Sequence, residues 1–462
     1  MINHVYSNTM QWALYGSSLF ELVTLIHRIA IFNYMPLQSY GALVSTLSLI
    51  HLAHHIADCG ATNSIPPLLP YFVHSKNLFK TMILKHTIIP HLPIVIGVSV
   101  LSVAYASIML PHSLPLHPIL LATLILLESI SSFLRQFLYT IQDTKAVVSI
   151  DLSLSCMRII LLWSFLFGYG IVLTPCFILS SHLICTVAGA MLKAWRVSLF
   201  YRTLPNNDNP LVIRWSYVLC TIKLPNYLLR LSRNLFTTNF LTPLFAIRFG
   251  LGTAGIFYFA SKLAHFFIAV IKITIGYTGN GLLAASKAQS QEQTKKVFAM
   301  LCNKLIRISL PLVALFIISS PLIATYWYEQ TACQKIVVLC ALFLLLSISE
   351  CFFILYECFY IIQHAASQLF GIKIAELAFL YGFIQLSAVT SPDLMLCGII
   401  CVRITTLMII AGLAHHLWKI APTMGRDRTR MIFALLRSSN ISFSLVKRWI
   451  FRKKPSVKKI CR

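Results

Sequence analysis

Twelve stretches of mostly apolar residues follow one another along the chain. Each has roughly the 20 residues that a helix needs to cross the hydrocarbon core of a bilayer. Glycine, proline and charged residues separate them, as expected of turns between spans. Their approximate limits are 10–32, 38–57, 83–110, 116–138, 146–168, 171–194, 216–245, 252–276, 304–325, 335–358, 366–389 and 394–418. We therefore predict an all-α polytopic membrane protein with about 12 transmembrane helices.

The composition excludes a soluble enzyme. Hydrophobic residues make up 58% of the chain and charged residues 11%, whereas an ordinary soluble domain has roughly 25% charged residues. Most of the 13 cysteines lie inside apolar runs, and no CxxC pair occurs, so we expect neither a disulfide framework nor a zinc site. No connection is long enough for a soluble catalytic domain. We predict no catalytic residue, no metal and no cofactor.

The distribution of positive charge sets the expected orientation. The formal charge is +25, from 38 basic and 13 acidic residues. If the N-terminus is cytoplasmic, 26 basic residues fall on the cytoplasmic side and only Arg248 and Lys335 on the other. Cytoplasmic loops collect lysine and arginine, so both termini are predicted to be cytoplasmic. Each basic residue near an anionic membrane surface contributes about 1 kcal/mol of attraction, so membrane lipids account for the charge and nucleic acid is not an expected partner.

An internal repeat relates the two halves of the chain. Leu138–Gln142 (LYTIQ) matches Phe359–Gln363 (FYIIQ) at an offset of 221, and Tyr40-Gly41 matches Ala254-Gly255 at an offset of 214. The matches fall at equivalent spans, which predicts two six-helix lobes related by a parallel pseudo-twofold repeat, with the substrate site between them. The predicted units are an N-terminal lobe (1–200), a cytoplasmic linker (201–215), a C-terminal lobe (216–418) and a basic cytoplasmic tail (419–462).

Two segments resemble a known family. Leu37–Gly41 (LQSYG), followed by an apolar span that ends in Asp58-Cys59-Gly60, resembles the first helical pair of bacterial polysaccharide flippases. Lys223-Leu224-Pro225, Phe249–Phe257 (FGLGTAGIF) and Ala260–Leu263 (ASKL) are similar to the start of that family's second half. The chain thus resembles the lipid-linked oligosaccharide flippases of the multidrug/oligosaccharidyl-lipid/polysaccharide exporter superfamily.

This resemblance implies a mechanism and a substrate. Members move bulky ligands by alternating access of two six-helix lobes, so the implied substrate is a lipid-linked anionic oligosaccharide and the implied location is the bacterial plasma (inner) membrane. The chain departs from the family in one place. Thr237-Thr238-Asn239 stands late in the seventh span, where such flippases often have an acid, so a role of that acid in ion coupling is in doubt here.

Basic residues inside two neighbouring spans repeat at helical spacing, and each set falls within roughly 80° of helix rotation. The sets are Lys223, Arg230 and Arg233 in the seventh span, and Lys262, His265 and Lys272 in the eighth. Arg28 in the first span and Arg403 in the last could add to the same region. Charges in lipid are costly unless they pair or line a wet cavity.

A cavity lined by these stripes would suit an anion, because arginine binds phosphate through paired donors. The alternative is that some of the side chains snorkel to the membrane surface or form ion pairs. Our candidate substrate-binding residues are Arg28, Arg230, Arg233, Lys262, His265 and Lys272.

Acidic residues in the spans point to buried pairing. Glu128 with Arg135, and Asp151 with Arg158, are each seven residues apart on one helix face, which favours structural pairing between helices in one polar network. The other acids are unranked candidates for a coupling ion. They are Glu21, Asp58, Glu350, Glu357 and Glu376, and Asp58 is better explained as a helix-end residue.

Two further features have open interpretations. His51, His54 and His55 on the second span either line a polar interior or hold a metal, although the acid of a HExxH helix is absent. The tail segment 431–451 mixes large apolar and basic residues, which is typical either of a surface-lying amphipathic helix or of a disordered basic tail.

The predicted function is translocation of a lipid-pyrophosphate-linked oligosaccharide, or of a peptidoglycan precursor, from the cytoplasmic to the outer leaflet. The alternative is a cation-coupled multidrug or metabolite antiporter of the same superfamily. The basic character of the expected interior disfavours cationic drugs. A membrane enzyme is disfavoured because no large outer loop or nucleophile constellation is present.

Overall fold

The computed structural model describes residues 15–58, 76, 89–109, 118–141, 143–168, 173–204, 227, 231, 234, 236–273, 283, 286, 290–327, 330–363, 365–386 and 391–418. Within these ranges the chain is helical and no strand occurs. The helices are α2 (Ser17–Tyr34), α3 (Leu37–Ala57), α6 (Ile89–Met109), α7 (Pro118–Thr140), α8 (Thr144–Trp163) with the π-helical turn η3 (Ser164–Gly168), α9 (Pro175–Thr203), α12 (Thr238–Phe249), α13 (Leu251–Ile273), α15 (Gln291–Trp327), α16 (Gln330–Ile362), α17 (Ala366–Leu386) and α18 (Pro392–Trp418).

These helices fall on the predicted spans. Six of them, α7, α8 with η3, α9, α15, α16 and α18, contain segments long and apolar enough to cross a membrane. The largest difference is α15, which begins at Gln291, well before the predicted span 304–325. Its first turns are polar, and hydropathy marks only the part of a helix that meets lipid. Of the predicted span 216–245, the described continuous helix is α12, which starts at Thr238.

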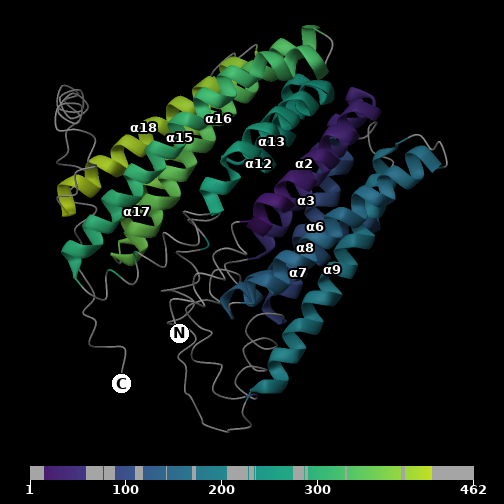
Figure 1. Cartoon of the computed structure of the whole chain (residues 1–462), viewed down its shortest axis with the longest axis horizontal. Coiled ribbons are helices and arrows are strands. Elements are labelled where there is room, and N and C mark those ends of the chain that lie inside the picture. The colour runs from purple at the N-terminus through teal and green to yellow at the C-terminus, as the bar shows by residue number, and fades with distance from the viewer. Residues whose placement is uncertain are drawn as a thin grey trace.

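The described α-helices form two lobes of six helices each, which lie side by side. The helices α2 to α9 pack together in one lobe, drawn from purple to blue, and α12 to α18 pack together in the other, drawn from teal to yellow (Figure 1). Buried leucine, isoleucine and phenylalanine side chains fill the lobes. The multi-pass, two-lobe all-helical fold predicted from the sequence is confirmed.

The lobes meet where α2 and α3 pack against α12 and α13 (Figure 1). The rings of Phe32 on α2 and Phe259 on α13 stack with centroids 4.3 Å apart. A Cβ atom added at Gly255 would lie 3.1 Å from Tyr40 Cδ1 and 3.3 Å from the Gly41 nitrogen. The motifs Tyr40-Gly41 and Ala254-Gly255, which the repeat relates, therefore touch each other, as expected close to a pseudo-twofold axis.

Candidate functional site

Basic side chains from both lobes gather at the interface between α2 and α13. The phenol ring of Tyr258 is 5% exposed, and Lys262 Nζ lies 4.9 Å from its centroid. Arg28 and Glu21 of α2 lie close enough for their charges to act on the Tyr258 hydroxyl. The structure therefore brings two of the predicted cations, Arg28 and Lys262, to one buried tyrosine.

His51 of α3 connects this region with the interior of the first lobe. The His51 imidazole interacts electrostatically with Lys262 of the second lobe and with Glu128 of its own lobe. We use the name interlobe site for Arg28, His51, Tyr258 and Lys262. A half-buried cationic pair beside an aromatic ring is suited to an anionic headgroup.

Of the remaining candidate substrate-binding residues, the structure describes the side chain of His265 and not those of the others. His265 is half-buried on α13, one turn beyond Lys262. Lys272 belongs to α13, but its side chain is outside the described part of the structure. Arg230 and Arg233 lie outside the described residues, as does Lys223.

Arg403 does not join the interlobe site, contrary to the sequence-based expectation. Its side chain is fully buried in the second lobe, where Nη1 donates to Glu376 Oε1 at 2.9 Å. Lys373 Nζ donates to the other carboxylate oxygen at 2.9 Å. Both cations lie over the ring of Phe353, at 3.6 and 3.5 Å from its centroid. Glu376, a candidate coupling site in the sequence, is therefore bound by two cations of its own lobe.

A second ion network holds the last three helices of the first lobe. Asp151 on α8 is 3.0 Å from Arg135 on α7 and 2.8 Å from Lys193 on α9. Lys193 Nζ also donates to Ser131 Oγ at 3.1 Å. The predicted pairing between helices is confirmed for Arg135 and Asp151. Lys193 is one of the 26 basic residues that the sequence counts on the cytoplasmic side. It lies within α9, which continues to Thr203, and its side chain is 1% exposed.

Glu128 finds a partner that the sequence did not indicate. Its Oε1 lies 3.0 Å from His182 Nε2 on α9, and Thr186 Oγ1 donates to the same oxygen at 3.5 Å. His51 and His54 of α3 interact electrostatically with the same carboxylate. Among the described residues, no group of three or more histidine, cysteine, aspartate or glutamate side chains could hold a metal ion.

Both lobes contain such an ion network. In the first lobe Asp151 pairs with the buried Lys193 and with the more exposed Arg135. In the second lobe Glu376 pairs with the buried Lys373 and Arg403. Each network shares one carboxylate between two cations, in line with the requirement that a charge in lipid be paired.

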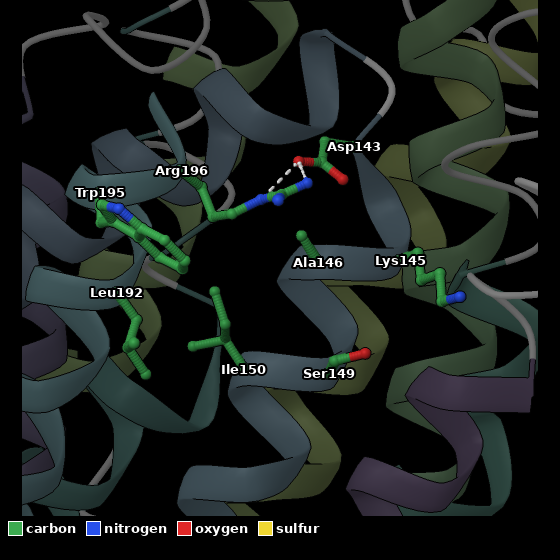
Figure 2. A pocket seen from close by; sticks show the side chains of 8 residues that line it. All are labelled: Asp143, Lys145, Ala146, Ser149, Ile150, Leu192, Trp195 and Arg196. Atoms are coloured by element: carbon green, nitrogen blue, oxygen red, sulfur yellow. Dashed lines mark hydrogen bonds and ion pairs between the residues drawn. The ribbon is translucent and has the colours of Figure 1, made fainter. Parts of the chain in front are cut away.

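A separate hollow of about 390 Å³ lies on the first lobe between α8 and α9. Figure 2 shows Leu192 and Trp195 of α9 beside Ile150 of α8, with Asp143 and Arg196 at the rim. Arg196 Nη2 donates to Asp143 Oδ2 at 2.7 Å. This hollow contains no residue of the interlobe site.

Asp58 takes the helix-end position predicted for it. It is the C-cap of α3, and its backbone N–H donates to the carbonyl of His54 at 3.0 Å. The tail segment 431–451 lies outside the described residues, so neither interpretation of it is tested.

The fold and its apolar helices define a multi-pass membrane protein of two six-helix lobes. It is similar to solved structures of MATE transporters. One, described as the inward-facing conformation of a multidrug resistance MATE family transporter, is 15% identical, with a TM-score of 0.60 over 91% of this chain and 96% of that one. Another, MATE in complex with MaL6, is 14% identical, with a TM-score of 0.63 over 90% and 96%.

No protein-family model matches the chain, and no curated protein matches it. At 14–15% identity, the likeness to solved structures is one of fold. The chain therefore shares the two-lobe fold of these solved MATE structures.

Proposed function

We propose that this protein is an alternating-access transporter that moves a lipid-pyrophosphate-linked oligosaccharide, or a related peptidoglycan precursor, between the leaflets of a membrane. The observation that carries the proposal is the convergence of Arg28 and Lys262, from different lobes, on Tyr258. An anionic headgroup between the lobes would bind both cations at once. Rocking of the lobes would then separate the two cations and release the headgroup.

The architecture of the lobes supports this mechanism. Each lobe is held internally by a buried ion network, around Asp151 in the first and Glu376 in the second. Breaking either network would leave charges in an apolar interior, so each lobe is expected to move as a rigid body. The interface between the lobes is where the chain can change shape at lower cost. The excess of basic residues on one side supports cytoplasmic termini, and a bacterial inner membrane is the location that the family resemblance implies.

Reconstitution tests the proposal directly. The purified full-length protein would be placed in liposomes with a fluorescent lipid-pyrophosphate oligosaccharide, and its movement between leaflets measured by quenching from one side. Because a hydrogen bond to a charged group contributes about 1.5–3 kcal/mol, Arg28→Gln combined with Lys262→Gln should slow the movement at least about tenfold. Lys145→Gln is the control, because Lys145 is an exposed cation on α8. Equal rates for the double variant and the wild type would contradict the proposal.

A second candidate is a cation-coupled multidrug or metabolite exporter. It is favoured by the similar structure described as a multidrug resistance MATE family transporter. The same liposomes discriminate the two, because an exporter of this kind would extrude a fluorescent organic cation along an imposed ion gradient. Such efflux, without movement of the lipid pyrophosphate, would replace the first proposal by the second.

A further inference from the structure

Glu128 and His182 form a carboxylate–imidazole pair inside the first lobe. Their side chains are 17% and 13% exposed, and Glu128 Oε1 lies 3.0 Å from His182 Nε2. They belong to α7 and α9, which pack directly against each other. A carboxylate that is hydrogen-bonded to an imidazole within a membrane helix bundle can bind and release a proton, because both groups titrate and neither is permanently charged.

The partners of Glu128 distinguish it from the other buried acids. Asp151 is held by an arginine and a lysine, and Glu376 is also held by an arginine and a lysine. A proton on either carboxylate would leave two buried cations without their counter-ion. The described hydrogen-bond partners of Glu128 are instead an imidazole and a hydroxyl, from His182 and Thr186.

Titratable groups face the pair from the surrounding helices. α3 contributes His51 and His54, α8 contributes Arg158 near His182, and the described side chains of α6 include no titratable group. Arg135 and Lys193 are also influenced by Glu128. Both of these cations are bound to Asp151, whose single negative charge compensates one of their two positive charges.

The pair is connected to the interlobe site through His51. The His51 imidazole interacts electrostatically both with Glu128 and with Lys262, and the rings of His51 and His54 are 5.9 Å apart. With His182 neutral, the pair carries one negative charge, and one added proton removes it. An anionic headgroup near Lys262 is repelled by the charged pair but not by the protonated pair.

We infer that Glu128 and His182 form a proton-binding site whose protonation strengthens the binding of an anionic headgroup at the interlobe site. The part of this inference that concerns the headgroup rests on the proposed function. The part that concerns the proton rests on the Glu128–His182 pair, whose atoms lie 3.0 Å apart. Because linkage is reciprocal, headgroup binding also promotes proton uptake. The proton comes from the aqueous buffer, resides on the carboxylate–imidazole pair and returns to water when the headgroup leaves.

Calorimetry on the purified protein measures how many protons are taken up when a ligand binds. A short-chain prenyl pyrophosphate would be titrated into wild type and variants in two buffers of different ionisation enthalpy. The wild type should take up protons on binding, and its affinity should fall as the pH rises through the titration of the pair. Glu128→Gln, which is permanently neutral, should abolish the protein's proton uptake and its pH dependence. The ligand's own titration is common to all variants and cancels in the comparison.

Two variants control for loss of structure. Asp143→Asn removes a carboxylate of the same lobe that is bound to Arg196 and lies outside the pair, so it should behave as the wild type. Glu128→Asp keeps a titratable carboxyl group and should restore part of the proton uptake. Proton uptake by Glu128→Gln equal to that of the wild type would overturn the inference.

A measurement without ligand separates this inference from the proposed function. Infrared spectra of the wild type should show a protonated carboxyl group appearing on acidification, and this band should be missing in Glu128→Gln. If the band appears but no prenyl pyrophosphate binds, the proton site stands, whereas its link to the headgroup and the proposed function fail. If identical bands appear in both proteins, the proton site itself is refuted.

Discussion

Gly41 of α3 lies directly against the backbone carbonyl of Leu251 at the start of α13, so a Cβ atom at position 41 would overlap that carbonyl oxygen. Small residues allow the backbones of membrane helices to approach closely. Here the close approach joins the two lobes. The obstacle to a side chain is a backbone atom, which cannot rotate away, so only glycine fits.

Gly41→Ala should therefore weaken the contact between the lobes at this end, by about the 1–3 kcal/mol typical of overpacking. Distances between spin labels at Tyr34 on α2 and Ile247 on α12, both exposed, would report the separation in a cysteine-depleted background. The variant should show a larger separated population. Gly97→Ala is the matched control, because nothing lies within 4 Å of a Cβ atom at Gly97. An unchanged distance distribution in Gly41→Ala would refute the assignment.

At the opposite end of α3, one hydrogen bond crosses between the lobes. Tyr227, in the predicted seventh span, donates from its hydroxyl to the carbonyl oxygen of Ile56 at 3.1 Å. Tyr227→Phe should remove about 1 kcal/mol from this contact. Hydrogen–deuterium exchange in the last turn of α3 should become faster, while the exposed Tyr381→Phe on α17 should have no effect. Equal exchange in both variants would mean that the bond does not hold this end.

The network around Asp151 predicts a large loss of stability. Asp151→Asn leaves the buried Lys193 without its counter-charge, which should cost about 3–5 kcal/mol. Asp143→Asn breaks a more exposed pair with Arg196 and should cost about 0–1 kcal/mol. Unfolding in mixed micelles measures both. Lys193→Met added to Asp151→Asn should recover part of the loss, and no recovery would show that the lysine charge is not the cause.

Much of this fold could be predicted from the sequence, because hydropathy measures the apolar character that a helix needs in contact with lipid. The predicted helix boundaries are wrong where a helix extends beyond its apolar residues. α15 begins at Gln291 and α9 continues through Lys193 to Thr203, since a helix can leave the hydrocarbon core without unwinding. Hydropathy alone also does not show that a lysine near such an end, Lys193, is buried and paired with Asp151 of the neighbouring helix.

The site was predictable only in part. Helical periodicity places Lys262 and His265 on one face but does not say which helix that face meets. The partner of Glu128 therefore could not be identified, and Arg403 was assigned to the wrong surface.

In the second lobe, removing the carboxylate of Glu376 should destabilise the protein more than removing the cation of Arg403. Glu376→Gln leaves Lys373 and Arg403 as two buried cations with their shared carboxylate removed, so it should destabilise the protein by about 3–5 kcal/mol. Arg403→Met leaves the neutral pair of Lys373 and Glu376, and methionine can fill the space over the Phe353 ring.

The second variant should therefore unfold at the higher temperature of the two, although it removes the larger side chain. Thermal unfolding followed by size-exclusion chromatography in detergent measures this order. The reverse order would show that packing of the Arg403 guanidinium between the rings of Phe236 and Phe353, at 4.6 and 3.6 Å, contributes more than charge compensation by Glu376.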